Sequence, residues 1–102
     1  MKQIKAITDF GIKEVRVIGA KKEIAGELWA VCEVPTKYMN AKEPLMMRRV
    51  LHYKTGANIP VRGLRFNATG KQYLEAAARF LSSIPADDIK KEVSKYEQIN
   101  PL

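Results

Sequence analysis

The chain has 102 residues, 46% of them hydrophobic, so it is long enough for one small domain and too apolar for a disordered segment. Eighteen Lys and Arg against eleven Asp and Glu give a net charge of +7, which indicates either an acidic partner or a charge that serves solubility alone. A single cysteine excludes an internal disulfide and a thiolate-based zinc site. With no signal-peptide stretch and no apolar run long enough to cross a membrane, these totals predict an intracellular protein with no membrane partner.

The first predicted element is a hairpin. Residues 4–8 form a strand, residues 9–11 supply the turn, and a second strand runs through Val15 and Val17. These two valines share one strand face, and Arg16 lies on the other.

Residues 22–34 fit two kinds of secondary structure. Apolar residues at helical spacing are Ile24, Leu28, Val31 and Cys32. The alternating residues of a strand from 28 to 34 are Leu28, Ala30, Cys32 and Val34. Gly26 weakens a helix by about 1 kcal/mol. The helix is preferred because a later segment repeats the pattern, and Pro35 ends either element.

That later segment is residues 64–81, which align with residues 15–32 without a gap. Apolar residues coincide at eight of the 18 aligned positions, and two basic identities occur, Arg16 with Arg65 and Lys22 with Lys71. The alignment predicts an internal duplication of a strand followed by a helix. The alternative is that any two strand–helix units share this periodicity.

Residues 36–44 form a connector, and the segment that follows is ambiguous. Residues 40–43 resemble a helix capping box, and an apolar stripe continues through residue 51. Residues 50–54 also read as a strand before a turn at 55–58. A helix from 41 to about 49 that leads into a short strand satisfies both signals.

The second copy is easier to interpret. Residues 61–66 predict a strand, residues 67–70 a turn with N-cap side chains, and residues 73–84 a helix that Pro85 ends. An amphipathic helix follows at about 86–97, and residues 99–102 are expected to fray.

The predicted fold is a single α+β domain. It consists of two similar strand-and-helix motifs, each a hairpin plus a helix, packed around a shared core. Motif one covers about 1–35, the connector about 36–44, motif two about 45–84 and the C-terminal helix about 86–97. Leu28 and Phe80 are placed on the inner stripes of the two repeat helices.

No catalytic, cofactor or metal-binding residues are predicted. His52 has no nucleophile or orienting acid nearby in the sequence and is interpreted as a surface or half-buried polar residue. Cys32 falls on an apolar stripe and is interpreted as a core residue. Asp87 and Asp88 are adjacent, so they do not face each other as an acid–base pair, and they suit a helix start.

The basic residues near the strands form the candidate binding face. It consists of Arg16, Arg49, Arg62 and Arg65, which would hold phosphates if the strands shared a sheet. Phe66, Tyr73 and Phe80 fall on predicted core stripes, which disfavours a stacking platform for single-stranded nucleic acid. Trp29, Tyr38 and Tyr53 are less clearly internal.

The length of 102 residues and the repeated motif at 12–32 and 61–81 give the chain a resemblance to a family. It is similar to a small orphan protein of filamentous viruses of Acidianus. The resemblance implies a viral accessory protein in the host cytoplasm, without enzymatic chemistry and with no catalytic residues to transfer.

The function predicted from the sequence is a non-enzymatic binding module. A protein or peptide partner would lie in the apolar seam between the two motifs. The alternative is a nucleic-acid-binding protein that uses the basic strand face. No small-molecule substrate is evident.

Overall fold

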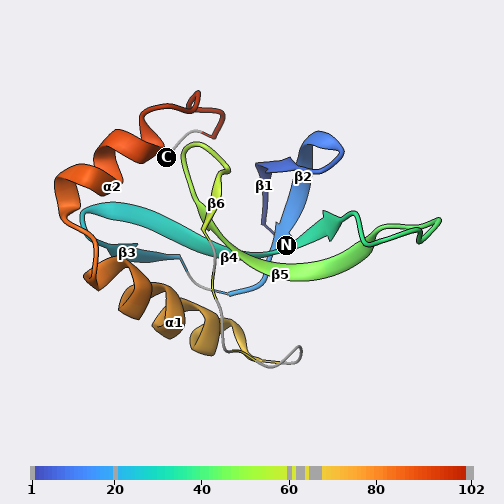
Figure 1. Ribbon diagram of the computed structural model, residues 1–102, viewed down its shortest axis with the longest axis horizontal. Coiled ribbons are helices and arrows are strands. Elements are labelled where there is room, and N and C mark those ends of the chain that lie inside the picture. The colour runs from blue at the N-terminus through green and yellow to red at the C-terminus, as the bar shows by residue number, and fades with distance from the viewer. Residues whose placement is uncertain (1, 20, 60, 62–63, 65–67, 101–102) are drawn as a thin grey trace.

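The computed structural model describes residues 2–19, 21–59, 61, 64 and 68–100. These residues form an α+β fold with one antiparallel sheet and two helices (Figure 1). The strands pair in the order β1-β2-β4-β5-β6, and β3 pairs with β4 beside β2. The elements are β1 (Gln3–Thr8), β2 (Gly11–Val17), β3 (Lys22–Ile24), β4 (Glu27–Thr36), β5 (Leu45–His52), β6 (Asn58–Ile59), α1 (Gly70–Ser82) and α2 (Ala86–Val93).

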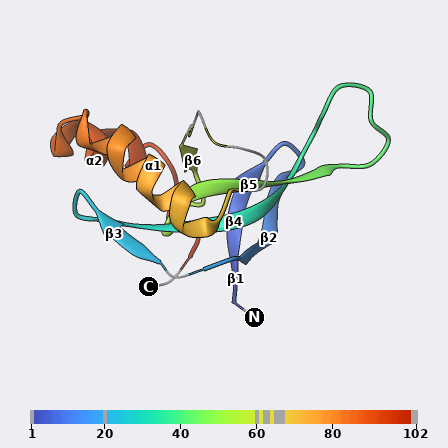
Figure 2. The same cartoon turned by 90° about the horizontal axis from the view of Figure 1, so that it is seen from below.

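The centre of the sheet is the long pair of β4 and β5. Residues 29–36 pair with residues 52–45 without interruption. Both faces of this pair are buried, because the sheet curls around one face and the helices cover the other (Figures 1 and 2). Alternate residues of one strand therefore enter two different cores.

The inner core lies inside the curled sheet. Its members are Ile4, Ala6, Val15, Ala30, Cys32, Val34, Leu51 and Tyr53. The curl closes where the Ile7 N–H donates to the Gly56 oxygen at 3.0 Å. The buried Asn100 side chain continues the closure, since its amide bonds the N–H and the oxygen of Lys5 and the oxygen of Tyr53.

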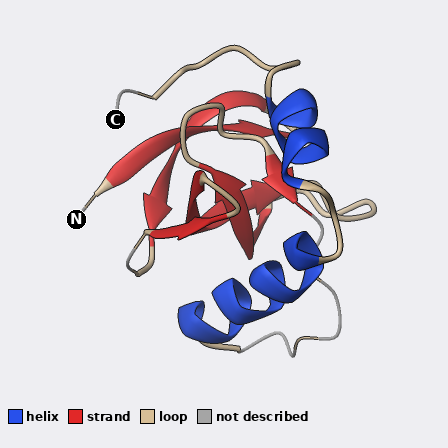
Figure 3. Ribbon diagram, turned by 90° about the vertical axis from the view of Figure 1, so that its left-hand side faces the viewer, coloured by secondary structure: helices blue, strands red, loops and turns tan. Residues whose placement is uncertain are grey.

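The helix-facing core lies between the sheet and the two helices, which sit on the same side of the sheet (Figure 3). Its members are Trp29, Val31, Val50, Ala77, Leu81 and Ile89. Helix α1 is capped at its N-terminus by Thr69, one of the N-cap side chains expected in the turn, and the cap is a capping box: the Thr69 hydroxyl accepts the Gln72 N–H at 3.2 Å, and the Gln72 side chain accepts the Thr69 N–H.

Pro35 explains why β2 pairs with β4 only at Arg16 and Val17. The Ile18 N–H donates to the Val31 oxygen, so the backbone groups of Val31 point toward β2. Because these groups alternate in direction along a strand, those of Pro35, four residues later, also point toward β2. Because proline has no N–H to donate, the ladder ends before that position.

The helix predicted within residues 22–32 is wrong. This segment forms β3 and β4 around the turn residues Ala25 and Gly26, which both have positive φ. Such a two-residue turn joins antiparallel strands, and the Trp29 Nε1–H secures it by donating to the Ile24 oxygen at 3.1 Å. The strand alternative for residues 28–34 is therefore the correct one.

The helix predicted from 41 to about 49 is also wrong, because residues 45–52 form β5. Its pairing with β4 along all eight residues satisfies the backbone groups on that edge of the strand. The apolar stripe that suggested a helix is divided between the two faces of the strand: Val50 enters the helix-facing core and Leu51 the inner core.

Other local predictions are confirmed. The first hairpin, α1 and a second amphipathic helix are present, although α2 ends at Val93. The expected fraying fails at Ile99 and Asn100, whose N–H groups both donate to the Lys54 oxygen. The repeat strand at 61–66 lies mostly outside the described residues. Two hairpin-plus-helix motifs are not confirmed, since residues 22–32 contain no helix.

Candidate functional site

An apolar groove lies between the helices and the sheet. It has a volume of about 360 Å³. The apolar residues that line it are Trp29, Ala57, Ile59, Phe80, Leu81, Ile84, Ile89, Val93 and Tyr96. Trp29 is buried, whereas Phe80 is 39% and Tyr96 is 42% exposed. Large aromatic surface is therefore accessible at a concave site, which is the usual form of a binding site.

The charges that line this groove oppose the charge of the whole chain. Asp88 and Glu92 are the acidic residues that line it, and both lie on α2, four residues apart. Glu92 forms an exposed ion pair with Lys95 at 3.0 Å, and Asp88 forms none among the described residues. The groove thus combines apolar walls with an acidic side in a chain of net charge +7.

Phe80 was expected on the inner stripe of its helix, and the structure places it on the groove instead. Leu28 is half-buried at the edge of the inner core, on a strand and not on a helix. The inner positions of α1 are taken by Ala76, Ala77 and Leu81.

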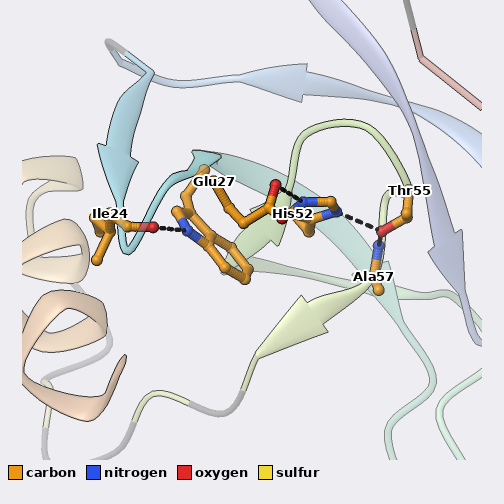
Figure 4. A network of polar contacts seen from close by, with 6 residues as sticks. Ile24, Glu27, His52, Thr55 and Ala57 are labelled. Carbon is orange, nitrogen blue, oxygen red and sulfur yellow. Dashed lines mark hydrogen bonds and ion pairs between the residues drawn. The ribbon is translucent and has the colours of Figure 1, made fainter. Parts of the chain in front are cut away.

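A polar network sits at one end of the groove, around the buried His52 (Figure 4). The His52 Nε2 lies 3.1 Å from Glu27 Oε2, and its Nδ1 lies 2.9 Å from Thr55 Oγ1. When the Nε2–H donates to the Glu27 carboxylate, Nδ1 of the neutral ring accepts the Thr55 hydroxyl proton. The Thr55 oxygen in turn accepts the Ala57 N–H at 3.3 Å.

This acid–histidine–hydroxyl order resembles that of a catalytic triad. Thr55 is only 2% exposed, and its oxygen is engaged by the His52 ring and the Ala57 N–H. The network joins the β3–β4 turn to the β5–β6 turn and holds the ring edge-on to Trp29, with centroids 5.1 Å apart. Sequence reasoning missed it, because Glu27 is 25 positions from His52 and His52 was expected at the surface or half-buried.

Cys32 lies in the inner core, as its apolar surroundings in the sequence predicted. Burial raises the pKa of its thiol to about 12. A neutral thiol in this position packs as a small apolar side chain.

Two lysines converge above one tyrosine ring. The Lys2 Nζ lies 5.2 Å and the Lys21 Nζ 4.5 Å from the centre of the Tyr53 ring. The proximity of the two amines raises the pKa of Lys2 and lowers the pKa of Lys21. Among the described residues neither amine has a carboxylate partner, so positive charge is concentrated here.

The predicted basic face is not formed by its two described members. Arg16 is exposed on β2 and pairs with Glu33, on the sheet face opposite the inner core. Arg49 pairs with Cys32 and lies on the same face as Leu51, toward the inside of the curl. Arg62 and Arg65 lie outside the described residues.

The sequence indicated parts of the groove. The amphipathic stripe of the C-terminal helix identified Ile89, Val93 and Tyr96, and the helical periodicity of 73–84 identified Leu81 and Ile84. Trp29, Ala57 and Ile59 were not foreseen. They reach the groove only through the pairing of β4, β5 and β6.

No family model, no curated protein and no solved structure matches this chain. Among the described residues no three His, Cys, Asp or Glu side chains are grouped to hold a metal ion. Neither helix in the described part of the chain has the length and apolar character that crossing a membrane requires.

Proposed function

We propose that this protein is a non-enzymatic binding module whose partner is a protein segment that places an apolar side chain in the groove between the helices and the sheet. The observation that carries the proposal is the exposed aromatic surface of Phe80 and Tyr96 beside a cavity of about 360 Å³. Interfaces gain most of their affinity from a few such anchored contacts. The seam expected between two motifs is replaced by this groove.

The acidic side of the groove defines the partner further. Asp88 and Glu92 favour a segment in which Lys or Arg stands next to the apolar anchor. The volume suits one or two large side chains and leaves the rest of the partner outside. The groove would thus recognise a short basic–apolar motif.

Selection from a random peptide library displayed on phage tests this proposal. We expect the selected peptides to share an aromatic or large aliphatic residue beside Lys or Arg. Trp29 is the only tryptophan and lines the groove, so its fluorescence reports binding directly. Phe80→Ala should weaken binding about tenfold or more, and Asp88→Asn less.

Phe10→Ala is the matched control for Phe80→Ala. Phe10 is 43% exposed, close to the 39% of Phe80, but it lies in the β1–β2 turn and does not line the groove. Its replacement should leave affinity unchanged. Selected peptides that bind wild type and Phe80→Ala equally well would contradict the proposal, as would a selection that yields no common motif.

A second proposal is nucleic-acid binding, supported by the net charge of +7 and by the convergence of Lys2 and Lys21 over Tyr53. Phosphate contacts make affinity fall steeply with salt. If an oligonucleotide binds, Lys21→Ala and Arg16→Ala should each reduce the slope of log K against log salt by about one unit or less. Binding that is insensitive to salt would rule this function out.

A further inference from the structure

A second cavity opens at one end of the curled sheet, where the ends of β1 and β4 approach β5 and β6. It has a volume of about 260 Å³. Its apolar walls are Ile7, Val34 and Ile59. It does not contain Phe80 or Tyr96, so it is a different site from the groove, although β6 lines both.

Arg49 contributes the positive charge of this cavity. The side chain is half-buried, and its Nη2 donates to the Met47 Sδ at 3.4 Å. A thioether is a weak acceptor, and Arg49 forms no ion pair among the described residues. A partly desolvated guanidinium with most of its donors unused is stabilised by an anion that it can bind in two-pronged fashion.

Asp9 contributes a negative charge to the same cavity without pairing with Arg49. The Lys37 N–H donates to its Oδ2 at 2.9 Å, which fixes the carboxylate at the mouth. The carboxylate has further lone pairs to offer. An inorganic phosphate would meet this negative charge, whereas a ligand with both a carboxylate and an N–H donor would satisfy both residues.

The remaining polar side chains are those of Thr8, Thr36 and Asn58, and the Asn58 amide can both donate and accept. The Thr8 hydroxyl donates to the Gly11 oxygen at 2.7 Å, and the Thr36 hydroxyl donates to the Val34 oxygen at 3.2 Å. Their protons are therefore committed, while their oxygens can still accept. The cavity thus combines one strong donor for an anion with several acceptors for N–H groups, above an aliphatic wall.

We propose that this cavity binds an aliphatic α-amino-acid carboxylate, either free or as the C-terminal residue of a peptide. The carboxylate would bind to the Arg49 guanidinium, the α-nitrogen would donate to Asp9, and the side chain would contact Ile7, Val34 and Ile59. The site does not depend on the groove, because a partner in the groove would leave Arg49 and Asp9 untouched.

The test follows amide chemical shifts of the full chain during titration with four probes: leucine, N-acetyl-leucine, leucinamide and inorganic phosphate. Leucine or N-acetyl-leucine should shift the amides of Thr8, Thr36 and Arg49 in a saturable manner. Tighter binding of leucine identifies a free amino acid as the ligand, and tighter binding of N-acetyl-leucine a peptide terminus. Leucinamide and phosphate should not saturate these shifts.

Arg49→Gln should weaken binding of the carboxylate probes about tenfold or more, and Arg49→Lys should do so less, since it keeps the charge and loses the planar fork. Asp9→Asn should weaken the binding of leucine more than the binding of N-acetyl-leucine. Arg16→Gln removes an equivalent charge from the opposite sheet face and should change nothing.

Three outcomes would overturn the proposal. The first is that neither carboxylate probe saturates at millimolar concentration. The second is that Arg49→Gln, with amide shifts that show it to be folded, binds as the wild type does. The third is that phosphate or leucinamide competes equally with leucine.

Discussion

The inner core and the helix-facing core share β4 and β5 but are closed in different ways. The inner core is sealed by a backbone hydrogen bond from Ile7 to Gly56 and by the Asn100 side chain, whose amide bonds the backbone of Lys5. The helix-facing core is covered by side chains of α1 and α2, which leave a groove beside Phe80. The helix-facing core therefore keeps accessible apolar surface that the closed part of the inner core lacks. Stability should depend most on the inner core, and binding of a protein partner on the groove.

The largest effect should come from Gly56. A Cβ atom there would lie 2.5 Å from the Lys5 oxygen and 2.8 Å from the Ala6 Cα, and its φ is +70°. Gly56→Ala should lower the free energy of unfolding by about 3–5 kcal/mol, through strain and overlap together. Urea denaturation measures this.

Gly26→Ala is the matched control for that variant. Its φ is +79°, yet nothing lies within 4 Å of the added Cβ atom. It should cost only about 1–2 kcal/mol. Equal costs at the two positions would mean that the close approach of the β5–β6 turn to β1 does not seal the inner core.

The next prediction compares one residue from each core. Leu51 is fully buried in the inner core, and Leu51→Ala should cost about 2–5 kcal/mol. Phe80→Ala removes a larger side chain but should cost about 1 kcal/mol or less, because Phe80 is partly exposed on the groove. Equal destabilisation of the two variants in urea would contradict the expectation that stability depends more on the inner core than on the residues of the groove.

The pH dependence of stability should report on the inner core through Cys32. Its pKa is about 12 in the folded protein, and the unfolded thiol titrates near its usual value of about 8.5. Below that value both states hold the proton, so this thiol adds no pH dependence. Between about pH 8.5 and 12 only the unfolded chain loses the proton, so the free energy of unfolding falls as pH rises.

Cys32→Ala isolates this contribution, because all other titrating groups remain. The stability difference between wild type and Cys32→Ala should shrink by about 1–2 kcal/mol from pH 8 to pH 10. An unchanged difference would show that the thiol is not held neutral by burial.

The smallest expected effect is a gain in stability. Ala25 has a φ of 54° in the two-residue turn between β3 and β4, where asparagine is favoured before glycine. Ala25→Asn should raise the free energy of unfolding by about 0.5–1 kcal/mol. A loss would indicate that the turn at the edge of the helix-facing core differs from this geometry.

The features that sequence analysis predicted correctly depend on local contacts. The Thr69 cap, the stripe of α2 and the first hairpin are each determined by residues a few positions apart. The apolar pattern of residues 24–32 fits both helical and strand periods. The choice of strand over helix is determined by the pairing of Trp29 with His52, which is more than twenty positions away in the chain.

The candidate sites also combine residues with a local sequence signal and residues placed only by strand pairing. Arg49 was selected from the sequence for its charge, but its position inside the curl depends on pairing with Cys32. Asp9 was recognised only as a turn residue, and its place beside Arg49 depends on how the sheet curls. The groove combines residues from β4, β6 and both helices, and only the helical members had a local signal.

The hydrogen bonds between Asn100 and Lys5 join residues that are 95 positions apart. During translation at about 5–20 residues per second, residue 100 follows residue 5 by about 5–20 s. The outer edge of β1 lacks its Asn100 partner for all of that time, and an unpaired strand edge is open to pairing with other chains. Translation rate therefore sets how long a nascent chain is exposed to aggregation, and slower synthesis should lengthen that period.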